Sequence, residues 1–340
     1  MINKYESLQP LRSVAIIGSG LAGLTAAILF EQNDCEATIF EKSRGPGGRL
    51  AAKRVEGGSA DMWAQYFTIR NPRFHRFLEQ HAGADSYASW QGRFGYQTSS
   101  GAWERFPDEE RYVGVPRMTA ISRGLSENVS LVAETRIQKL NQDSDGWTLT
   151  SAEGEHFGPY DAVVITAPPA QARDLLADSN LPQLAEQLDE PVSHVQPCWA
   201  VAAHFPETPF ERYDGMRVQS DILSWAANNS SKPGREGAGQ WWVLHARSDW
   251  SWDNKDAPAE EVAGEMVREF LAVTGADGQP DDLVTHRWLY AKSSDPATPG
   301  HLWFSEHRIG LAGDWLSGGR VEGAFDSASG LVKSVTEASA

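Results

Sequence analysis

A glycine turn close to the start of the chain constrains the fold more than any other feature. Gly18, Gly20 and Gly23 follow the β-branched run of residues 13–17 and open an Ala- and Leu-rich stretch. This pattern predicts a strand, a tight turn and a buried helix. A second strand ends at Glu41, 18 residues after Gly23, which is the order expected of a dinucleotide-binding unit.

Each of the three glycines has its own steric task in such a unit. Gly18 permits the tight turn, Gly20 lets the backbone approach a pyrophosphate, and Gly23 lets the helix close against the strand. The free N–H groups at the start of the helix, that of Ala22 among them, can bind anionic oxygens. The carboxylate of Glu41 can accept hydrogen bonds from both hydroxyls of an adenosine ribose, which argues against a 2′-phosphate at this place.

A second glycine-rich loop, at residues 44–49, follows the acid, and a plain NAD-binding unit has no need of one. The loop resembles the GG-R loop of flavoproteins of the amine oxidase and hydroxybenzoate hydroxylase kind. In those proteins the arginine, here Arg49, reaches the phosphate or ribityl region of FAD. An ordinary glycine loop with a solvated arginine is the alternative. We therefore expect FAD as the cofactor.

The end of the chain is predicted to return to that cofactor. Residues 308–314 read as a strand that ends on an acid, and a helix of small residues begins at Val321 and Glu322. This resembles the C-terminal Gly-Asp strand of FAD enzymes, whose acid, here Asp314, bonds the ribityl chain. The positive end of the helix would stabilise the negative charge of a reduced flavin. No cysteine follows Cys198, so non-covalent FAD is expected.

Composition limits the classes of partner. The formal net charge of −16 disfavours nucleic acid and anionic membranes, so any polyphosphate substrate must find local arginines. The two cysteines, Cys35 and Cys198, are too few for a disulfide framework or a thiolate zinc site, and no metal is expected. Residues 1–11 lack the apolar core of a secretory signal, and residues 14–30 are too short and glycine-broken for a membrane span. A cytoplasmic protein is expected.

The order of strands predicts an α/β (mixed α+β) fold of two domains. Residues 161–169 resemble the returning strand of two-dinucleotide-fold flavoproteins, and residues 194–205, 216–225, 240–246 and 284–290 alternate as strands of a second sheet, interrupted by a helix capped by Asp256. The expected architecture is that of p-hydroxybenzoate hydroxylase-like flavoproteins. It divides into a Rossmann-type FAD domain (residues 1–67, 113–190 and 305–340) and an antiparallel-sheet substrate domain (residues 68–112 and 191–304).

Several strings resemble the renalase family, of the bacterial type, in particular. They are the Asp-x-x-Ala-Gln-Tyr string of residues 61–66, the Trp-Ala-x-Asn string of residues 225–228 and the Val-Leu-His-Ala string of residues 243–246. The resemblance implies an oxidase of 2- or 6-dihydro-NAD(P). Such an enzyme transfers a hydride from this substrate to FAD, releases NAD(P)⁺, and returns the electrons to dioxygen as hydrogen peroxide.

These arguments give a set of candidate site residues. The predicted FAD-binding residues are Gly18, Gly20, Ala22, Gly23, Glu41, Lys42, Arg49, Gln65, Tyr66, Arg136, Ile137, Asp314, Val321 and Glu322. Asn228 and His245 are predicted to anchor the carboxamide or ribose of the substrate, with Trp288 and Tyr290 as flat walls. A turn asparagine and a hydrogen-bonded sheet histidine are the alternatives for the first two. No acid or base is expected, because a dihydropyridine gains aromaticity when it loses hydride.

Three other functions compete with this prediction. The first alternative is an FAD-dependent amine oxidase, which would need two aromatic rings facing one another across the flavin. A desaturase or protoporphyrinogen-type oxidase would need an apolar tunnel and a membrane-facing helix. A binding protein of this fold without flavin would be colourless.

Overall fold

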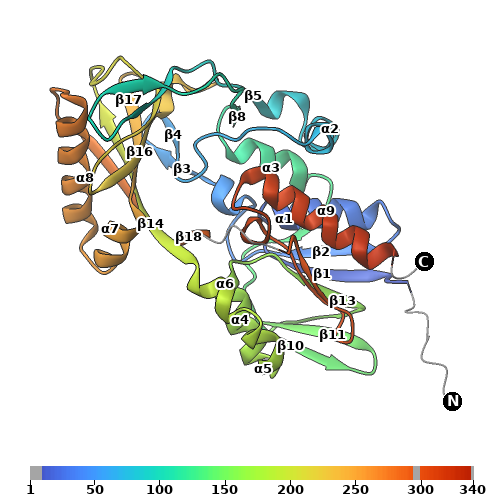
Figure 1. Cartoon of the computed structure of the whole chain (residues 1–340). Helices are drawn as coiled ribbons and strands as arrows, with labels where there is room; N and C mark the ends of the chain where they lie inside the picture. The colour runs from blue at the N-terminus through green and yellow to red at the C-terminus, as the bar shows by residue number, and fades with distance from the viewer. Residues whose placement is uncertain (1–9, 294–298, 338–340) are drawn as a thin grey trace.

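The structure is a computed structural model that describes residues 10–293 and 299–337 of the 340-residue chain. Two large β-sheets organise it, and the long strand β14 (Val195–Phe205) leads from one half of the molecule to the other (Figure 1). One sheet is mostly parallel and carries the glycine turn. The other is mostly antiparallel.

The mostly parallel sheet has six strands drawn from distant parts of the chain. In spatial order they are β19 (Leu302–Phe304), β20 (Ile309–Leu311), β13 (Ala162–Ile165), β1 (Ser13–Ile17), β2 (Glu36–Phe40) and β9 (Ser130–Val132). Only the β19–β20 pair is antiparallel. All four residues of β13 are buried, as a strand covered on both faces requires. The chain therefore returns to this sheet repeatedly, as predicted.

Helices and a small sheet cover the two faces of this layer. One face packs against α1 (Leu21–Glu31), α2 (Pro72–His81), α3 (Thr119–Ser126) and α9 (Val321–Glu337) in one apolar core. The other face packs against α4 (Pro169–Asp178), α5 (Pro182–Glu186) and the sheet of β10 (Ile137–Asp143), β11 (Gly146–Ser151) and β12 (His156–Tyr160). The short helix α6 (Asp189–Ser193) then leads into β14.

The second sheet has seven strands. Their order is β18 (Asp282–Ser293), β14, β17 (Gln240–Ala246), β16 (Leu223–Asn228), β15 (Gly215–Arg217), β6 (Phe94–Gln97) and β7 (Trp103–Arg105). One face packs against α8 (Ala259–Thr274), and α7 (Ser248–Asp253) lies against β14. The hairpin of β3 (Ala52–Val55) and β4 (Gly58–Asp61) packs on the opposite face. Strands β5 (Tyr87–Ser89) and β8 (Tyr112–Gly114) pair separately.

The predicted α/β class is confirmed, and most of the predicted elements lie where they were expected. The segment of residues 216–225 is an exception, because it forms two strands, β15 and β16. The predicted cap of α8 is also wrong, since the helix begins after Pro258 and the carboxylate of Asp256 pairs with Lys255 instead. Two segments assigned to the substrate domain lie with the parallel sheet: β19 pairs with β20, and α2 packs on α9 through Phe74. The division into domains stays a prediction.

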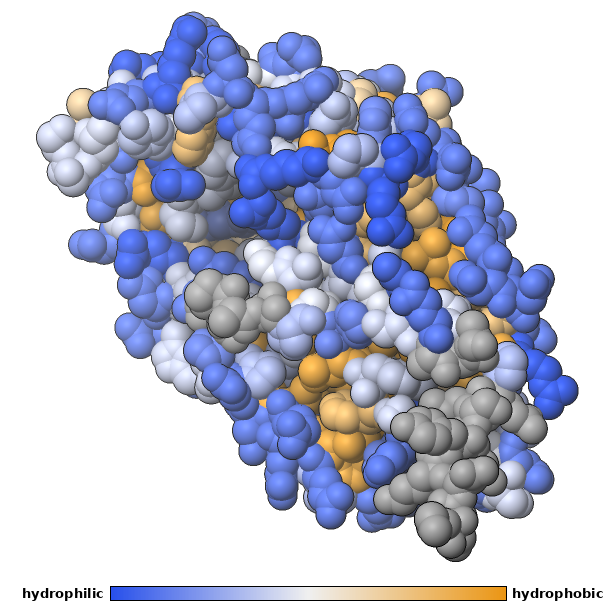
Figure 2. Space-filling view, turned by 45° about the vertical axis from the view of Figure 1, so that its right-hand side comes forward, coloured by the Kyte–Doolittle hydropathy of each residue, from blue (hydrophilic) through white to orange (hydrophobic). Residues whose placement is uncertain are grey.

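The face of the molecule in Figure 2 is mostly hydrophilic, with hydrophobic patches between the polar side chains. Three large hydrophobic residues of the described chain are exposed: Trp252, Leu283 and Leu289. Scattered residues of this kind are normal on a protein surface and mark no docking face. None of the described helices combines the length and the apolar run that a bilayer crossing requires.

We predict that Gly23→Ala destabilises the fold, whereas Gly45→Ala does not. A Cβ on Gly23 would lie 1.9 Å from the carbonyl oxygen of Gly18, which is backbone and cannot move aside. The expected loss is at least the roughly 1–3 kcal/mol of ordinary overpacking. A Cβ added to Gly45 would meet no atom within 4 Å, and Gly45 has no positive φ, so Gly45→Ala is the matched control. Equal midpoints of thermal unfolding for the two variants would contradict this packing argument.

Candidate cofactor and substrate site

A cavity of about 1450 Å³ is lined by residues of both large sheets. Its walls include the glycine turn after β1, the end of β2, the loop after β20 and inner residues of β16, β17 and β18. Binding sites for single drug-sized ligands usually measure about 300–1,000 Å³. This cavity is therefore large enough for a dinucleotide cofactor and a second molecule beside it.

The glycine turn presents bare backbone to this cavity. Gly18 has a φ of +103°, and its N–H donates to the carbonyl oxygen of Phe40 at 2.9 Å. Gly20 lines the cavity, and a Cβ added there would meet nothing within 4 Å. Helix α1 begins next, at Leu21, without a side-chain cap. Its first N–H groups are thus available to an anionic ligand, as the fingerprint predicts.

Glu41 is fixed at the edge of the turn by three donors. The backbone N–H and the hydroxyl of Ser19 donate to one carboxylate oxygen at 3.0 and 2.7 Å, and the N–H of Ser43 donates to the other at 2.8 Å. The residue lines the cavity although it is only 8% exposed. Each oxygen of a carboxylate can accept more than one hydrogen bond, so Glu41 can still accept hydrogen bonds from ribose hydroxyls. This arrangement fits the adenosine part of FAD.

The other two predicted cofactor segments reach the same cavity. Gly48 faces the glycine turn, because a Cβ there would lie 3.5 Å from the Cα of Gly20. The guanidinium of Arg49 forms an ion pair with the carboxylate of Asp314 and also donates to the carbonyl oxygen of Ala291 at 3.1 Å. Three segments that are far apart in the sequence therefore meet in one groove.

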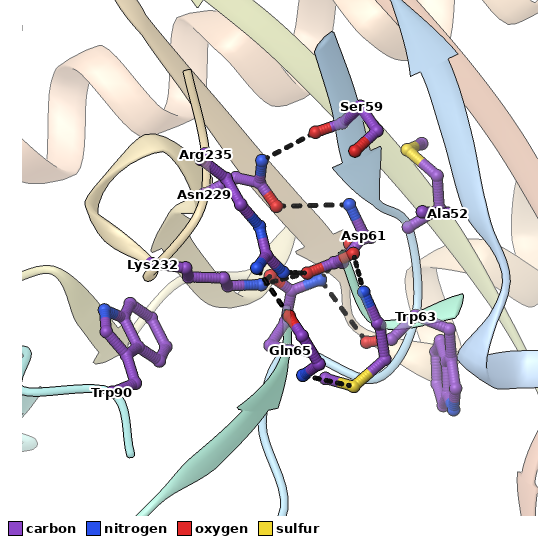
Figure 3. Close-up of polar contacts among 12 residues, drawn as sticks. Ala52, Ser59, Asp61, Trp63, Gln65, Trp90, Asn229, Lys232 and Arg235 are labelled. Atoms are coloured by element: carbon purple, nitrogen blue, oxygen red, sulfur yellow. Dashed lines mark hydrogen bonds and ion pairs between the residues drawn. The ribbon is translucent and has the colours of Figure 1, made fainter. Parts of the chain in front are cut away.

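Asp61, Lys232 and Arg235 form a buried charge cluster at the start of the segment of residues 61–67 (Figure 3). One oxygen of Asp61 accepts from the Nζ of Lys232 at 3.0 Å and pairs with Arg235, and the other accepts from the N–H of Met118 at 3.0 Å. The side chains of Asp61, Lys232 and Arg235 are at most 4% exposed. Lys232 also donates to Gln65 at 3.1 Å. The side-chain amide of Gln65, which lines the cavity, is thus held by a buried lysine that does not line it.

The cluster shifts the ionisation of its members. Burial alone would raise the pKa of Asp61, but Lys232, Arg235 and the N–H of Met118 bring it below its ordinary value. Burial lowers the pKa of Lys232 to about 8 in spite of the neighbouring carboxylate. Asp61 is therefore the one partner that compensates two buried cations in this cluster.

His245 lies in the cavity wall as a neutral ring. Its Nε2 lies 2.9 Å from the carbonyl oxygen of Met62, which can only accept, so Nε2 carries the proton and Nδ1 is left as an acceptor. Burial lowers the pKa of His245 to about 4. The ring of His245 stacks on that of Trp63, with the two ring centres 5.2 Å apart, and the ring centres of Trp63 and Trp288 are 6.0 Å apart. The wall is flat and aromatic, with one polar acceptor.

The structure brings nearly all of the predicted site residues into this one cavity. Of the predicted cofactor residues, only Gly23 does not line it, since its position packs against the turn; of the predicted substrate residues, His245, Trp288 and Tyr290 do. Asn228 does not: it is buried at the end of β16, where its N–H donates to the carbonyl oxygen of Asp214 at 2.7 Å. The individual roles of these residues stay predictions.

Sequence reasoning missed other residues of the site. Trp63 and Trp225 line the cavity, and Lys232 and Arg235 support it from behind. Lys232 lies four residues after the Trp-Ala-x-Asn string, but nothing in the sequence pairs this lysine with an aspartate 171 residues earlier. For Trp225, simple alternation along β16 would have misled, because the register shifts between Leu223 and Trp225: Leu223 lies in the core beneath α8, whereas Trp225 lines the cavity.

Comparison with known proteins decides the family. Residues 96–330 match the family of flavin containing amine oxidoreductases, and residues 16–81 match an NAD(P)-binding Rossmann-like domain. The chain belongs to the flavin containing amine oxidoreductase family. It is accordingly an FAD-dependent oxidoreductase, and FAD is the cofactor that the glycine turn and Glu41 fit.

Curated relatives match over parts of their length. The bifunctional tRNA 5-methylaminomethyl-2-thiouridine biosynthesis protein of Magnetococcus marinus is 26% identical over 220 residues, which are 53% of this chain and 33% of the relative. The hydroxyneurosporene desaturase of Rubrivivax gelatinosus is 36% identical over 64 residues, which are 18% of this chain and 12% of the relative. The matched segments thus span a third or less of these relatives.

Solved structures share the fold over nearly the whole chain. A putative protoporphyrinogen oxidase from Exiguobacterium matches with a TM-score of 0.74 and 14% identity, over 97% of this chain and 100% of that one. A reduced UDP-galactopyranose mutase matches with a TM-score of 0.76 and 12% identity, over 95% and 94% of the two chains. At these identities the likeness establishes the fold alone.

We predict that Asp61→Asn destabilises the protein more than Lys232→Met. The first change leaves two buried cations without a counter-ion, which typically costs about 3–5 kcal/mol. The second leaves the Asp61–Arg235 pair intact and removes a lysine whose charge is already disfavoured by burial. Thermal unfolding of the purified flavoprotein measures both.

Asp249→Asn is the matched control for this comparison. Asp249 also pairs with an arginine, Arg247, but both side chains are exposed, so little stability should be lost. A larger fall in unfolding midpoint for Lys232→Met than for Asp61→Asn would contradict the charge argument.

Proposed function

We propose that this flavoprotein is an oxidase of dihydro-NAD(P) isomers, of the renalase type, acting on 2- or 6-dihydro-NAD(P). The observation that carries the proposal is the aromatic wall of Trp63, His245 and Trp288, with a neutral histidine as its polar group. Bound FAD would take the hydride of the substrate and pass two electrons to dioxygen, so that NAD(P)⁺ and hydrogen peroxide leave.

The residues of this wall suit a substrate that needs orientation rather than deprotonation. A dihydropyridine becomes aromatic when it gives up a hydride, so a stacking surface and a fixed ring position are the main requirements. In this proposal Trp288 and Tyr290 confine the pyridine ring. The free Nδ1 of His245 accepts a hydrogen bond from the carboxamide NH₂, which a protonated histidine could not do.

The pairing of two strands supports the renalase assignment. The Trp-Ala-x-Asn string lies on β16 and the Val-Leu-His-Ala string on β17, and Trp225 and His245 stand directly opposite each other in the ladder. Both side chains line the cavity. The strings that resemble renalases most specifically thus contribute neighbouring groups to one site.

Oxidation of an amine is the second candidate function. The family match itself favours it, because the matching family is that of flavin containing amine oxidoreductases. It would use the same cavity but would break a C–H bond next to an amine nitrogen, and the nitrogen would have to enter uncharged or lose a proton on binding.

An anaerobic titration of the yellow protein decides between the two. We expect 2- or 6-dihydro-NAD(P) to bleach the flavin absorbance stoichiometrically, with 4-dihydro-NAD(P) and the α-anomer as comparison species. Admission of air should restore the colour and yield hydrogen peroxide. Bleaching by amines but by no dihydronicotinamide would replace this proposal with the amine oxidase.

We predict that His245→Ala slows flavin reduction by the dihydronicotinamide while FAD stays bound. Loss of one neutral hydrogen bond and of the stacked ring should lower the rate roughly tenfold. Because the pKa of His245 is lowered to about 4, the wild-type rate should show no ionisation of this ring between about pH 5.5 and 8.5. Rapid-mixing spectrophotometry measures the reduction rate.

His156→Ala is the control for that variant, since His156 is an exposed residue of β12, on the sheet that does not line the substrate wall. Flavin reduction that proceeds at the same rate in His245→Ala and His156→Ala would remove His245 from the site.

A further inference from the structure

The balance of acidic and basic residues in the cavity lining differs from that of the whole chain. The chain has 46 acidic and 30 basic residues, whereas the cavity is lined by six Asp or Glu and seven Lys or Arg side chains. In a protein of formal net charge −16, a polyphosphate has to find local cations, and the lining of this cavity lacks the acidic excess of the whole chain.

Some of these cations already have anionic or polar partners. Arg49 pairs with Asp314, Arg70 pairs with Glu109 at 2.8 Å, and Arg287 donates to the carbonyl oxygen of Lys255. Arg217, at the end of β15, forms no ion pair with any carboxylate in the described part of the chain. Its guanidinium lies 5.4 Å from the centre of the Phe106 ring, which leaves its donors available.

The ring under Arg217 is itself held in place. Arg111 lies 5.7 Å from the centre of Phe106 and 4.4 Å from that of Phe94, and it is only 6% exposed. Two guanidinium groups, that of the buried Arg111 and that of the exposed Arg217, thus lie close to the ring of Phe106. Such stacking restricts the rotamers of the exposed arginine and lowers the entropy lost when it binds an anion.

Arg217 stands in one row with two other residues of the substrate wall. On adjacent strands, Arg217 of β15 is opposite Trp225 of β16, and Trp225 is opposite His245 of β17. Residues directly opposite each other in a ladder project from the same face of the sheet. All three line the cavity. The row therefore offers an acceptor, a flat ring and a cation, spaced by about 4.8 Å per strand.

We propose that Arg217 binds the pyrophosphate of the dinucleotide substrate. The order of the row matches the order of groups in a reduced nicotinamide dinucleotide: the carboxamide at His245, the ribose at Trp225 and the phosphates at the guanidinium of Arg217. The assignment rests on the proposed function, because it takes the nicotinamide end of the substrate to lie at His245. It makes Arg217 a specificity residue that separates dinucleotides from substrates without phosphate.

Steady-state kinetics of Arg217→Met tests this role. With 6-dihydro-NAD, KM should rise about tenfold, as expected for loss of a charge-assisted hydrogen bond, while kcat stays unchanged. With the riboside of the same dihydronicotinamide, which has no phosphate, KM should not change. Arg217→Lys should recover part of the affinity, because it restores the charge but not the planar fork.

Arg212→Met is the matched control. Arg212 lies over the ring of Tyr213 at 5.5 Å in the same way, is exposed, and does not line the cavity. It should leave both substrates unaffected. An equal KM for 6-dihydro-NAD in Arg217→Met and Arg212→Met would overturn the assignment.

Calorimetric titration of the FAD-loaded protein with ADP-ribose separates this inference from the proposed function. ADP-ribose carries the pyrophosphate but cannot donate a hydride, so its binding needs no turnover. Binding by the wild type that weakens in Arg217→Met supports the anion site even if no dihydronicotinamide bleaches the flavin. Failure of the wild type to bind ADP-ribose, in a protein that does oxidise dihydronicotinamides, would overturn the anion site and leave the proposed function standing.

Discussion

The carboxylate of Asp61 joins three segments that are far apart in the sequence, one of which leads into α3 and donates the N–H of Met118. It ends the β3–β4 hairpin, which follows the second glycine loop, and it pairs with Lys232 and Arg235 from the loop between β16 and β17 of the antiparallel sheet. Asn229 reinforces the joint, since its side chain accepts from the N–H of Asp61 and donates to the carbonyl oxygen of Ser59. Because a buried carboxylate between two cations tolerates little displacement, the joint fixes the segment of residues 62–66 in the cavity wall.

That segment carries much of the chemistry of the site. The carbonyl oxygen of Met62 sets the tautomer of His245, Trp63 forms the stacking partner of the same ring, and Gln65 receives a hydrogen bond from Lys232. One stretch of backbone therefore orients the substrate wall on one side and faces the cofactor segments on the other. A shift of this stretch would disturb both ligands together, which explains why charged groups are buried here at a cost in desolvation.

The parts of this architecture that the sequence predicts are those governed by local rules. Gly18 has the positive φ that a tight turn requires, Gly23 leaves no space for a side chain, and Asn71 caps α2 by accepting from the N–H of Arg73, which is the role that local rules favour for Asn before Pro at a helix start. In each case the determining contact lies within a few residues. Glu41 and Asp314 could be placed for a related reason, since both follow strands whose carboxyl ends meet at one edge of a parallel sheet.

Long-range contacts explain what local rules could not predict. Asn228 and Asn229 are adjacent and chemically identical, yet only Asn229 reaches the β3–β4 hairpin, because Asn228 is the last residue of β16 and Asn229 begins the 3-10 turn that follows it. Asp256 is of a residue type that often caps helices, but α8 begins three residues later, after Pro258, and the carboxylate of Asp256 lies beside Lys255 and Arg287. Likewise, the partner of Lys232 is an acid on a distant hairpin, which no periodicity reveals.

The register of the antiparallel sheet explains why a short sequence string can depend on contacts with distant parts of the chain. His245 can face the cavity only if β17 keeps its register with both β14 and β16, since a slip of one residue would turn it into the apolar layer beneath α8. Leu244 and Trp242 occupy that layer, so β17 packs against the core with one face and lines the cavity through His245 with the other. A string such as Val-Leu-His-Ala is therefore specific for a reason. It records the register that places His245, Trp225 and Arg217 side by side on three strands, all on the face of the sheet that lines the cavity.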